Sequence, residues 1–157
     1  MKTVGVLLLL VSAFGAALAL RQREGRREKE LSALLELLLA IRHGMLHGRL
    51  PLGDIYASFE NGALDACGFL THLREGGLFF ALNADTLALR KEELSFLYVY
   101  AEALGKRFLD EERSASEEAE AALKSLRERH STEGVRKSKL QGTLLVSGTG
   151  MLLLLLL

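Results

Sequence analysis

The histidines at positions 43 and 47 are the first residues of this chain whose spacing suggests chemistry. They are four residues apart, which places both imidazoles on one face of a helix. A zinc-protease helix carries glutamate directly after the first histidine, whereas this chain has Gly44 there, and no third ligand is evident. We therefore predict a surface or partly buried histidine pair and no metal site.

Asp65, Cys67 and His72 share a short predicted helix and are the second group considered, as a thiol catalyst. Cys67 is the only cysteine of the chain and lies among apolar residues, where thiols are usually packed and inert. No glycine-rich phosphate loop is present, and Gly148 and Gly150 fall inside an apolar run. We expect no catalytic, cofactor-binding or metal residue, and hence a protein that is not an enzyme.

The composition favours an all-α fold. Of the 157 residues only one is proline and none is tryptophan, and leucine, alanine, glutamate, arginine and lysine dominate. All 20 acidic residues, and every basic residue except Lys2, lie between Arg21 and Lys139. This middle is nearly neutral, so it has no basic face of the kind that nucleic acid requires.

Two apolar stretches enclose this polar middle. Residues 140–157 contain no charged side chain and finish in six leucines, and residues 1–20 are apolar after Lys2. As a helix the former is about 27 Å long, close to the hydrocarbon thickness of a bilayer. We predict an N-terminal transmembrane helix over 1–20, a cytoplasmic helical domain over 21–139 and a C-terminal transmembrane helix over 140–157.

The charges beside the two spans predict the orientation. Both inner flanks are basic, which retains the middle in the cytoplasm and leaves both termini outside. These flanking residues are Arg21, Arg23, Arg26, Arg27, Lys29, Arg127, Arg129, Arg136, Lys137 and Lys139. In the alternative interpretation residues 1–19 are a signal peptide cleaved after Ala19, and the domain is exported and tail-anchored.

The middle is expected to form five or six helices. Apolar residues at three- and four-residue steps predict helices over 26–46, 63–74 and 91–109, with a short one after Pro51. Residues 78–89 are interpreted as a short helix, a turn and the start of another helix. Residues 110–139 form a long charged helix that runs into the second span, with His130 solvated.

This order of features resembles the stage III sporulation protein AB family (SpoIIIAB) of endospore-forming bacteria. The best-matched pieces are IRHGMLHGRLPL (41–52), EELSFLYVYAEALG (92–105) and the span from Gly142 to Gly150. The chain departs from the family pattern at Gly44, His47 and Leu50.

The resemblance implies a role in a secretion-like channel complex between mother cell and forespore. Its cytoplasmic domain is similar to one helical domain of the type II secretion and type IV pilus inner-membrane platform. The implied partners are a secretion-type ATPase, other membrane proteins of the complex and the lipid bilayer, with no cofactor. The candidate contact residues lie in the elbow from Gly48 to Asp54 and at the acidic helix start: Gly48, Pro51, Leu52, Asp54, Asp110, Glu111 and Glu112.

Overall fold

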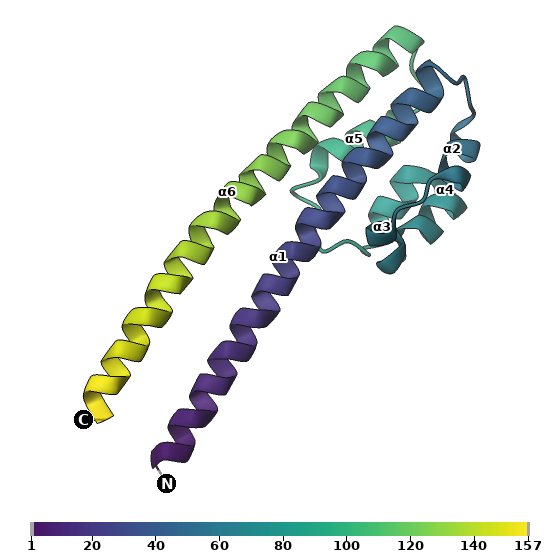
Figure 1. Cartoon of the computed structure of the whole chain (residues 1–157). Helices are drawn as coiled ribbons and strands as arrows, with labels where there is room; N and C mark the ends of the chain where they lie inside the picture. Colours follow the sequence, from purple (N-terminus) through teal and green to yellow (C-terminus); the bar gives the residue numbers. More distant parts are fainter. Residues whose placement is uncertain (1, 157) are drawn as a thin grey trace.

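Two long helices run side by side through the whole molecule. In this computed structural model, which describes the backbone of residues 2–156, they are α1 (Lys2–Leu46) and α6 (Leu109–Leu156). They are antiparallel, so the beginning of α1 and the end of α6 lie at the same end of the molecule (Figure 1). The predicted continuity of the long charged helix with the second apolar stretch is confirmed, and α1 is continuous with the first apolar stretch in the same way.

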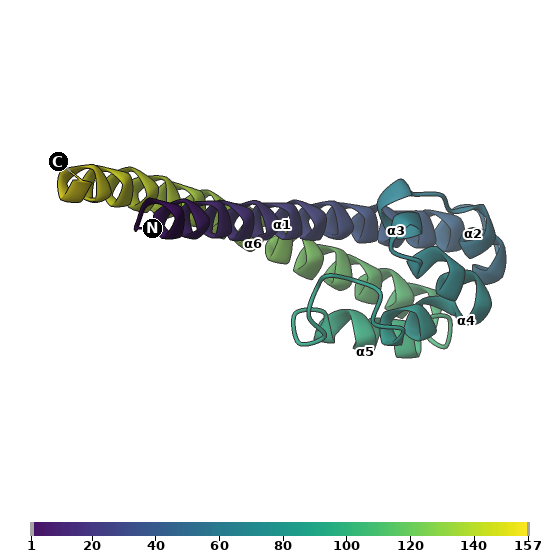
Figure 2. The same cartoon turned by 90° about the horizontal axis from the view of Figure 1, so that it is seen from below.

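Four short helices form a second layer at the opposite end of this pair (Figure 2). They are α2 (Leu52–Ser58), α3 (Gly62–Ala66), α4 (Phe69–Asn83) and α5 (Ser95–Ala103). Helices α2 and α3 contact α1, α5 contacts α6, and α4 contacts the other three short helices. Residues 2–156 contain no strand, so the all-α prediction is confirmed.

Side chains are described for Gly15, Leu18, Ala19 and residues 21–132. Among these residues, no helix is long and apolar enough to cross a membrane. The predicted spans over 1–20 and 140–157 lie outside this range, apart from those first three residues.

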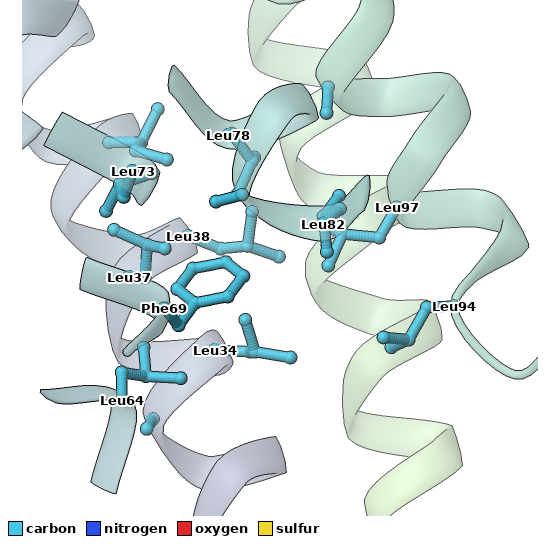
Figure 3. Close-up of a cluster of buried hydrophobic side chains, with 14 of the residues drawn as sticks. Leu34, Leu37, Leu38, Leu64, Phe69, Leu73, Leu78, Leu82, Leu94 and Leu97 are labelled. Atoms are coloured by element: carbon cyan, nitrogen blue, oxygen red, sulfur yellow. The ribbon is translucent and has the colours of Figure 1, made fainter. Parts of the chain in front are cut away.

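A leucine stripe on α1 is the centre of the core. Phe69 of α4 is fully buried and lies against leucines of α1 (Figure 3). Burying such a side chain contributes about 1.5–3 kcal/mol. The large apolar residues of α1 that are almost fully buried recur mostly at three- and four-residue steps, as predicted for this helix: Leu31, Leu34, Leu37, Leu38 and Ile41.

Charged groups complete the interface between the two long helices. Arg42 of α1 lies 2.7 Å from the carboxylate of Glu120, measured from Nη1 to Oε2. The other oxygen of Glu120 accepts from Lys124 Nζ at 2.6 Å, so this largely buried carboxylate is paired on both sides. Ala119 and Leu123 of α6 are buried beside it. The pairing fixes the register of α6 on α1.

A second buried carboxylate ties the connection between α4 and α5 to α1. Glu30 is 1% exposed and accepts from Arg26 Nε at 2.8 Å and from the backbone N–H of Ala88 at 2.7 Å. Arg27 Nε donates to the Ala88 carbonyl at 3.0 Å. These bonds hold a segment without a helix of its own against α1.

The bounds of the short helices differ from the prediction at glycine residues. The expected helix over 63–74 is divided, because Gly68 adopts a left-handed φ of 80° between α3 and α4. The pair Gly76-Gly77 only kinks α4. No new helix starts before residue 89, because the connection runs in turns as far as Leu94.

The predicted helix over 91–109 was also too long. Only Ser95–Ala103 is helical, and Gly105, with φ of 75°, ends the helix region rather than lying within it. Phe108, which the predicted amphipathic helix over 91–109 would have included, is 83% exposed as a result.

Gly44 permits a close approach between α1 and α2. A Cβ atom at this buried position would lie 2.6 Å from Ile55 Cδ1, closer than side chains tolerate. We predict that Gly44→Val destabilises the protein by about 1–3 kcal/mol through overpacking. Thermal unfolding followed by circular dichroism would measure the change.

Gly25→Val is the matched control on the same helix. A Cβ there meets nothing within 4 Å, so the substitution should be neutral or slightly stabilising. Equal unfolding midpoints for the two variants would contradict the proposed contact.

Candidate partner-binding surface

The elbow between α1 and α2 projects from the end of the molecule that lies away from the chain ends. The N–H groups of His47 and Gly48 donate to the His43 carbonyl, and that of Leu50 donates to Gly44, which closes the last turn of α1. Leu50 is 49% exposed. Pro51 is the N-cap of α2 rather than its first residue.

The beginning of α6 exposes apolar and acidic side chains together. Phe108 and Leu109 are 83% and 60% exposed, and Asp110 and Glu111 beside them are exposed as well. Carboxylates in the first turn of a helix interact favourably with its dipole. The predicted helix over 91–109 included Phe108, and the sequence signal against this was Gly105, three residues before it.

The structure brings these two segments together. Leu52 Cδ1 would lie 3.1 Å from a Cβ on Gly105, so α2 packs directly on the turn that precedes α6. Figure 1 shows the end of α1, the elbow and the beginning of α6 at the same end of the molecule. We call the exposed residues there the distal surface: Leu50, Asp54, Phe108, Leu109, Asp110 and Glu111.

Glu112 does not belong to the exposed part of this surface. It is 3% exposed, and its Oε2 accepts from the backbone N–H of Gly105 at 3.3 Å. The carboxylate therefore holds the turn that presents Phe108. Two of the seven candidate contact residues are therefore not exposed. Glu112 is buried beneath the surface and bonds the turn at Gly105, and Leu52 is half-buried against Gly105.

Unpaired polar atoms gather around Glu112. Within the described part of the chain, Glu112 Oε1, Tyr100 Oη, Ser116 Oγ and Arg107 Nη1 are buried without a hydrogen-bond partner of ordinary geometry. Tyr100 and Ser116 are only 4% and 2% exposed. A buried polar group without a partner costs about 1–3 kcal/mol, so this cluster weakens the fold locally.

Burial raises the pKa of two tyrosines near this cluster to about 12. For Tyr100 the Ser116 hydroxyl opposes the shift and the Glu112 carboxylate adds to it. For Tyr56 the backbone at Leu78 opposes the shift, and Glu112 again adds to it. Both phenols are therefore neutral hydrogen-bonding groups at physiological pH.

The histidines and the thiol first considered for chemistry make local contacts. The rings of His43 and His47 stack with centroids 5.0 Å apart. The Cys67 thiol donates to the Leu64 carbonyl, and His72 lies 3.5 Å from Glu75. No group of three metal-binding side chains occurs among the residues described.

His130 is less solvated than predicted. It is half-buried, and its Nε2 lies 3.2 Å from Glu93 Oε1 in the connection between α4 and α5. No spacing in the sequence links these two residues, which are brought together only by the packing of that connection on α6.

No protein-family model, curated protein or solved structure matches this chain.

We predict that Tyr100→Phe leaves stability at pH 7 unchanged or raises it, because it removes a buried hydroxyl that has no good partner. The variant should instead differ at alkaline pH. Between pH 10 and about 12 the unfolded wild type releases the Tyr100 proton and the folded protein retains it, so stability falls as the pH rises. The substitution removes this loss, which is on the order of 2–3 kcal/mol at most. Chemical unfolding from pH 8 to 12 would measure it.

Tyr98→Phe is the contrasting variant. Its hydroxyl donates to the Leu82 carbonyl at 2.6 Å, so its loss should cost about 0.5–1.5 kcal/mol already at pH 7. A larger loss for Tyr100→Phe than for Tyr98→Phe at pH 7 would show that the Tyr100 hydroxyl is well bonded.

Proposed function

We propose that this chain is a non-enzymatic inner-membrane platform component of a secretion-like channel complex in endospore formation. Two transmembrane helices anchor it on the mother-cell side, and its cytoplasmic domain docks a secretion-type ATPase of the same complex. The resemblance to the stage III sporulation protein AB family supplies the identity of the complex and of the partner. The geometry of the domain supports a role as a membrane-anchored docking platform.

The antiparallel pairing of α1 and α6 is the observation that carries this proposal. It brings the apolar stretches 1–20 and 140–157 to one end of the molecule, and the distal surface lies at the other (Figure 1). A protein held by both stretches would present its distal surface away from the bilayer, toward a soluble partner.

The composition of the distal surface supports a protein partner. Phe108 and Leu109 are large apolar residues that a monomer gains nothing by exposing, and exposed apolar groups rimmed by polar ones are typical of binding sites. The neighbouring carboxylates of Asp110 and Glu111 favour a partner with basic residues around an apolar centre.

The continuity of the long helices suggests how a partner would act on the membrane. Helix α6 begins at the distal surface and continues without interruption to residue 156. A displacement of its first turn by an ATPase would therefore be transmitted along one rigid element. Arg42 and Glu120 would pass part of that displacement to α1.

The side of the membrane on which the domain lies can be tested with one thiol. We predict that, in a Cys67→Ala background, Ser114→Cys is labelled by an impermeant reagent in lysed protoplasts but not in intact ones. Ser114 is exposed, so access depends on the membrane and not on burial. Labelling of intact protoplasts would instead favour an exported, tail-anchored adaptor with a cleaved signal, and an amino terminus at Leu20 would support that alternative.

Docking can be tested on the full chain in lipid nanodiscs. We predict that Asp110→Lys combined with Glu111→Lys weakens binding of the secretion-type ATPase at least tenfold, about 1.4 kcal/mol, because it reverses the charge around Phe108. Phe108→Ser should have a similar effect through loss of apolar contact. Surface plasmon resonance would measure both.

Glu117→Lys combined with Glu118→Lys is the matched control. These residues are equally exposed on the same helix but lie two turns from its beginning. Equal weakening by both pairs would indicate general electrostatic attraction, and no binding by the folded wild type would refute the proposed docking.

A further inference from the structure

A groove between α1 and α3 lies at the edge of the domain nearest the predicted first span. Its volume is about 680 Å³. Helix α1 contributes Gln22, Gly25, Arg26 and Lys29, and the other wall is formed by small residues of α3, Gly62, Ala63 and Ala66. Space remains because these small side chains do not reach α1.

The position of the groove along α1 corresponds to the headgroup layer of a bilayer. Gln22 and Arg26 lie two and six residues beyond Leu20, about 3 and 9 Å along the helix axis. The headgroup layer on each side of a bilayer is about 5–7 Å thick. Side chains on a helix lean toward its N-terminus, so Lys29 leans from farther along α1 back toward this layer.

The charge of the groove changes along its length. An adjoining hollow of about 450 Å³, which shares Gly25, Lys29 and Ala63 with it, is lined by Glu28 and Glu36. Glu36 lies on the distal side of Lys29 and Glu28 directly precedes it, whereas the charged residues that line the end nearest Leu20 are Arg26 and, in a neighbouring hollow, Arg23. An anion is therefore favoured only at the end that faces the predicted span.

The cations of this end are available to a ligand. Lys29 and Arg23 are exposed and make no ion pair among the described residues. Arg26 uses Nε for Glu30 and donates weakly through Nη2 to Thr86 at 3.4 Å. The Glu30 carboxylate also lines the groove, but both of its oxygens are occupied and it is almost fully buried.

We propose that this groove binds the phosphate-bearing headgroup of an anionic phospholipid, with Lys29, Arg26 and Gln22 around the phosphate. The proposal rests on the proposed membrane anchoring. Such a lipid would set the height of the domain above the bilayer, because Ala88, held by Glu30, and α3 both adjoin this part of α1.

Cys67 provides the readout, because this sole thiol lines the same groove. The full chain would be placed in nanodiscs of pure phosphatidylcholine, or of phosphatidylcholine with phosphatidylglycerol, and alkylated with uncharged N-ethylmaleimide. We expect alkylation to be about fivefold slower with phosphatidylglycerol, as a site occupied four-fifths of the time would give. Lys29→Gln should restore most of the rate, and Lys106→Gln, which removes an exposed distal cation, should not.

The remaining outcomes distinguish a lipid phosphate from a free phosphate, and failure of the site from failure of the membrane anchoring. Equal protection in pure phosphatidylcholine by soluble glycerol phosphate would overturn the lipid assignment, because the site would then take a free phosphate. Equal alkylation in both lipids, or no effect of Lys29→Gln, would overturn the site while leaving the anchoring intact. A folded chain that fails to enter nanodiscs would instead refute the proposed function, and with it this inference.

Discussion

The packing of α1 against α6 is the interaction on which the rest of the structure depends. Helices α2 and α3 contact α1, α5 contacts α6, and Phe69 of α4 lies against the leucine stripe of α1, so the short helices are placed by the pair of long helices. The paired carboxylate of Glu120 then selects one register between two long helices whose apolar contacts alone would tolerate several. Because Arg42 and Lys124 are partly exposed, each pair contributes modestly, and the Glu120 carboxylate keeps one cation when the other is removed. The geometry of the distal surface therefore depends on the contacts between α1 and α6 around Glu120, which lie outside that surface.

The main architecture could be predicted from the sequence because it rests on long periodic patterns. Apolar residues at three- and four-residue steps identified α1, and sparse alanines within a charged stretch identified α6. The elbow at Gly48 and Pro51 was placed correctly because both residues have strong local preferences. The resemblance to a sporulation family rests on the order of the sequence features along the chain, and it stays a prediction.

The ends of the short helices and the burial of individual carboxylates depend on tertiary contacts, which a sequence pattern does not contain. Gly68 and Gly105 take left-handed conformations that end helices, whereas Gly77, also left-handed, only kinks one, and nothing local distinguishes these outcomes. Glu112 looked like one of three equivalent surface acids, yet Gly105 turns it inward. Glu30 gave no sign of its burial, because its partner Ala88 is distant in sequence and offers only a backbone N–H. The division of the candidate contact residues into exposed ones and a buried one, Glu112, therefore required the structure.

The antiparallel pairing also has a consequence for the order of folding. Arg42 and Glu120 are separated by nearly 80 residues, and closing a flexible loop of that length costs about 4 kcal/mol of chain entropy. Packing α2 and α3 onto α1 first would shorten the effective loop that the pairing of α1 with α6 has to close. During synthesis the leucines of α1 that α6 covers would remain open until the last third of the chain has emerged. A ribosome paused before Leu109 would therefore hold a chain in its most aggregation-prone form.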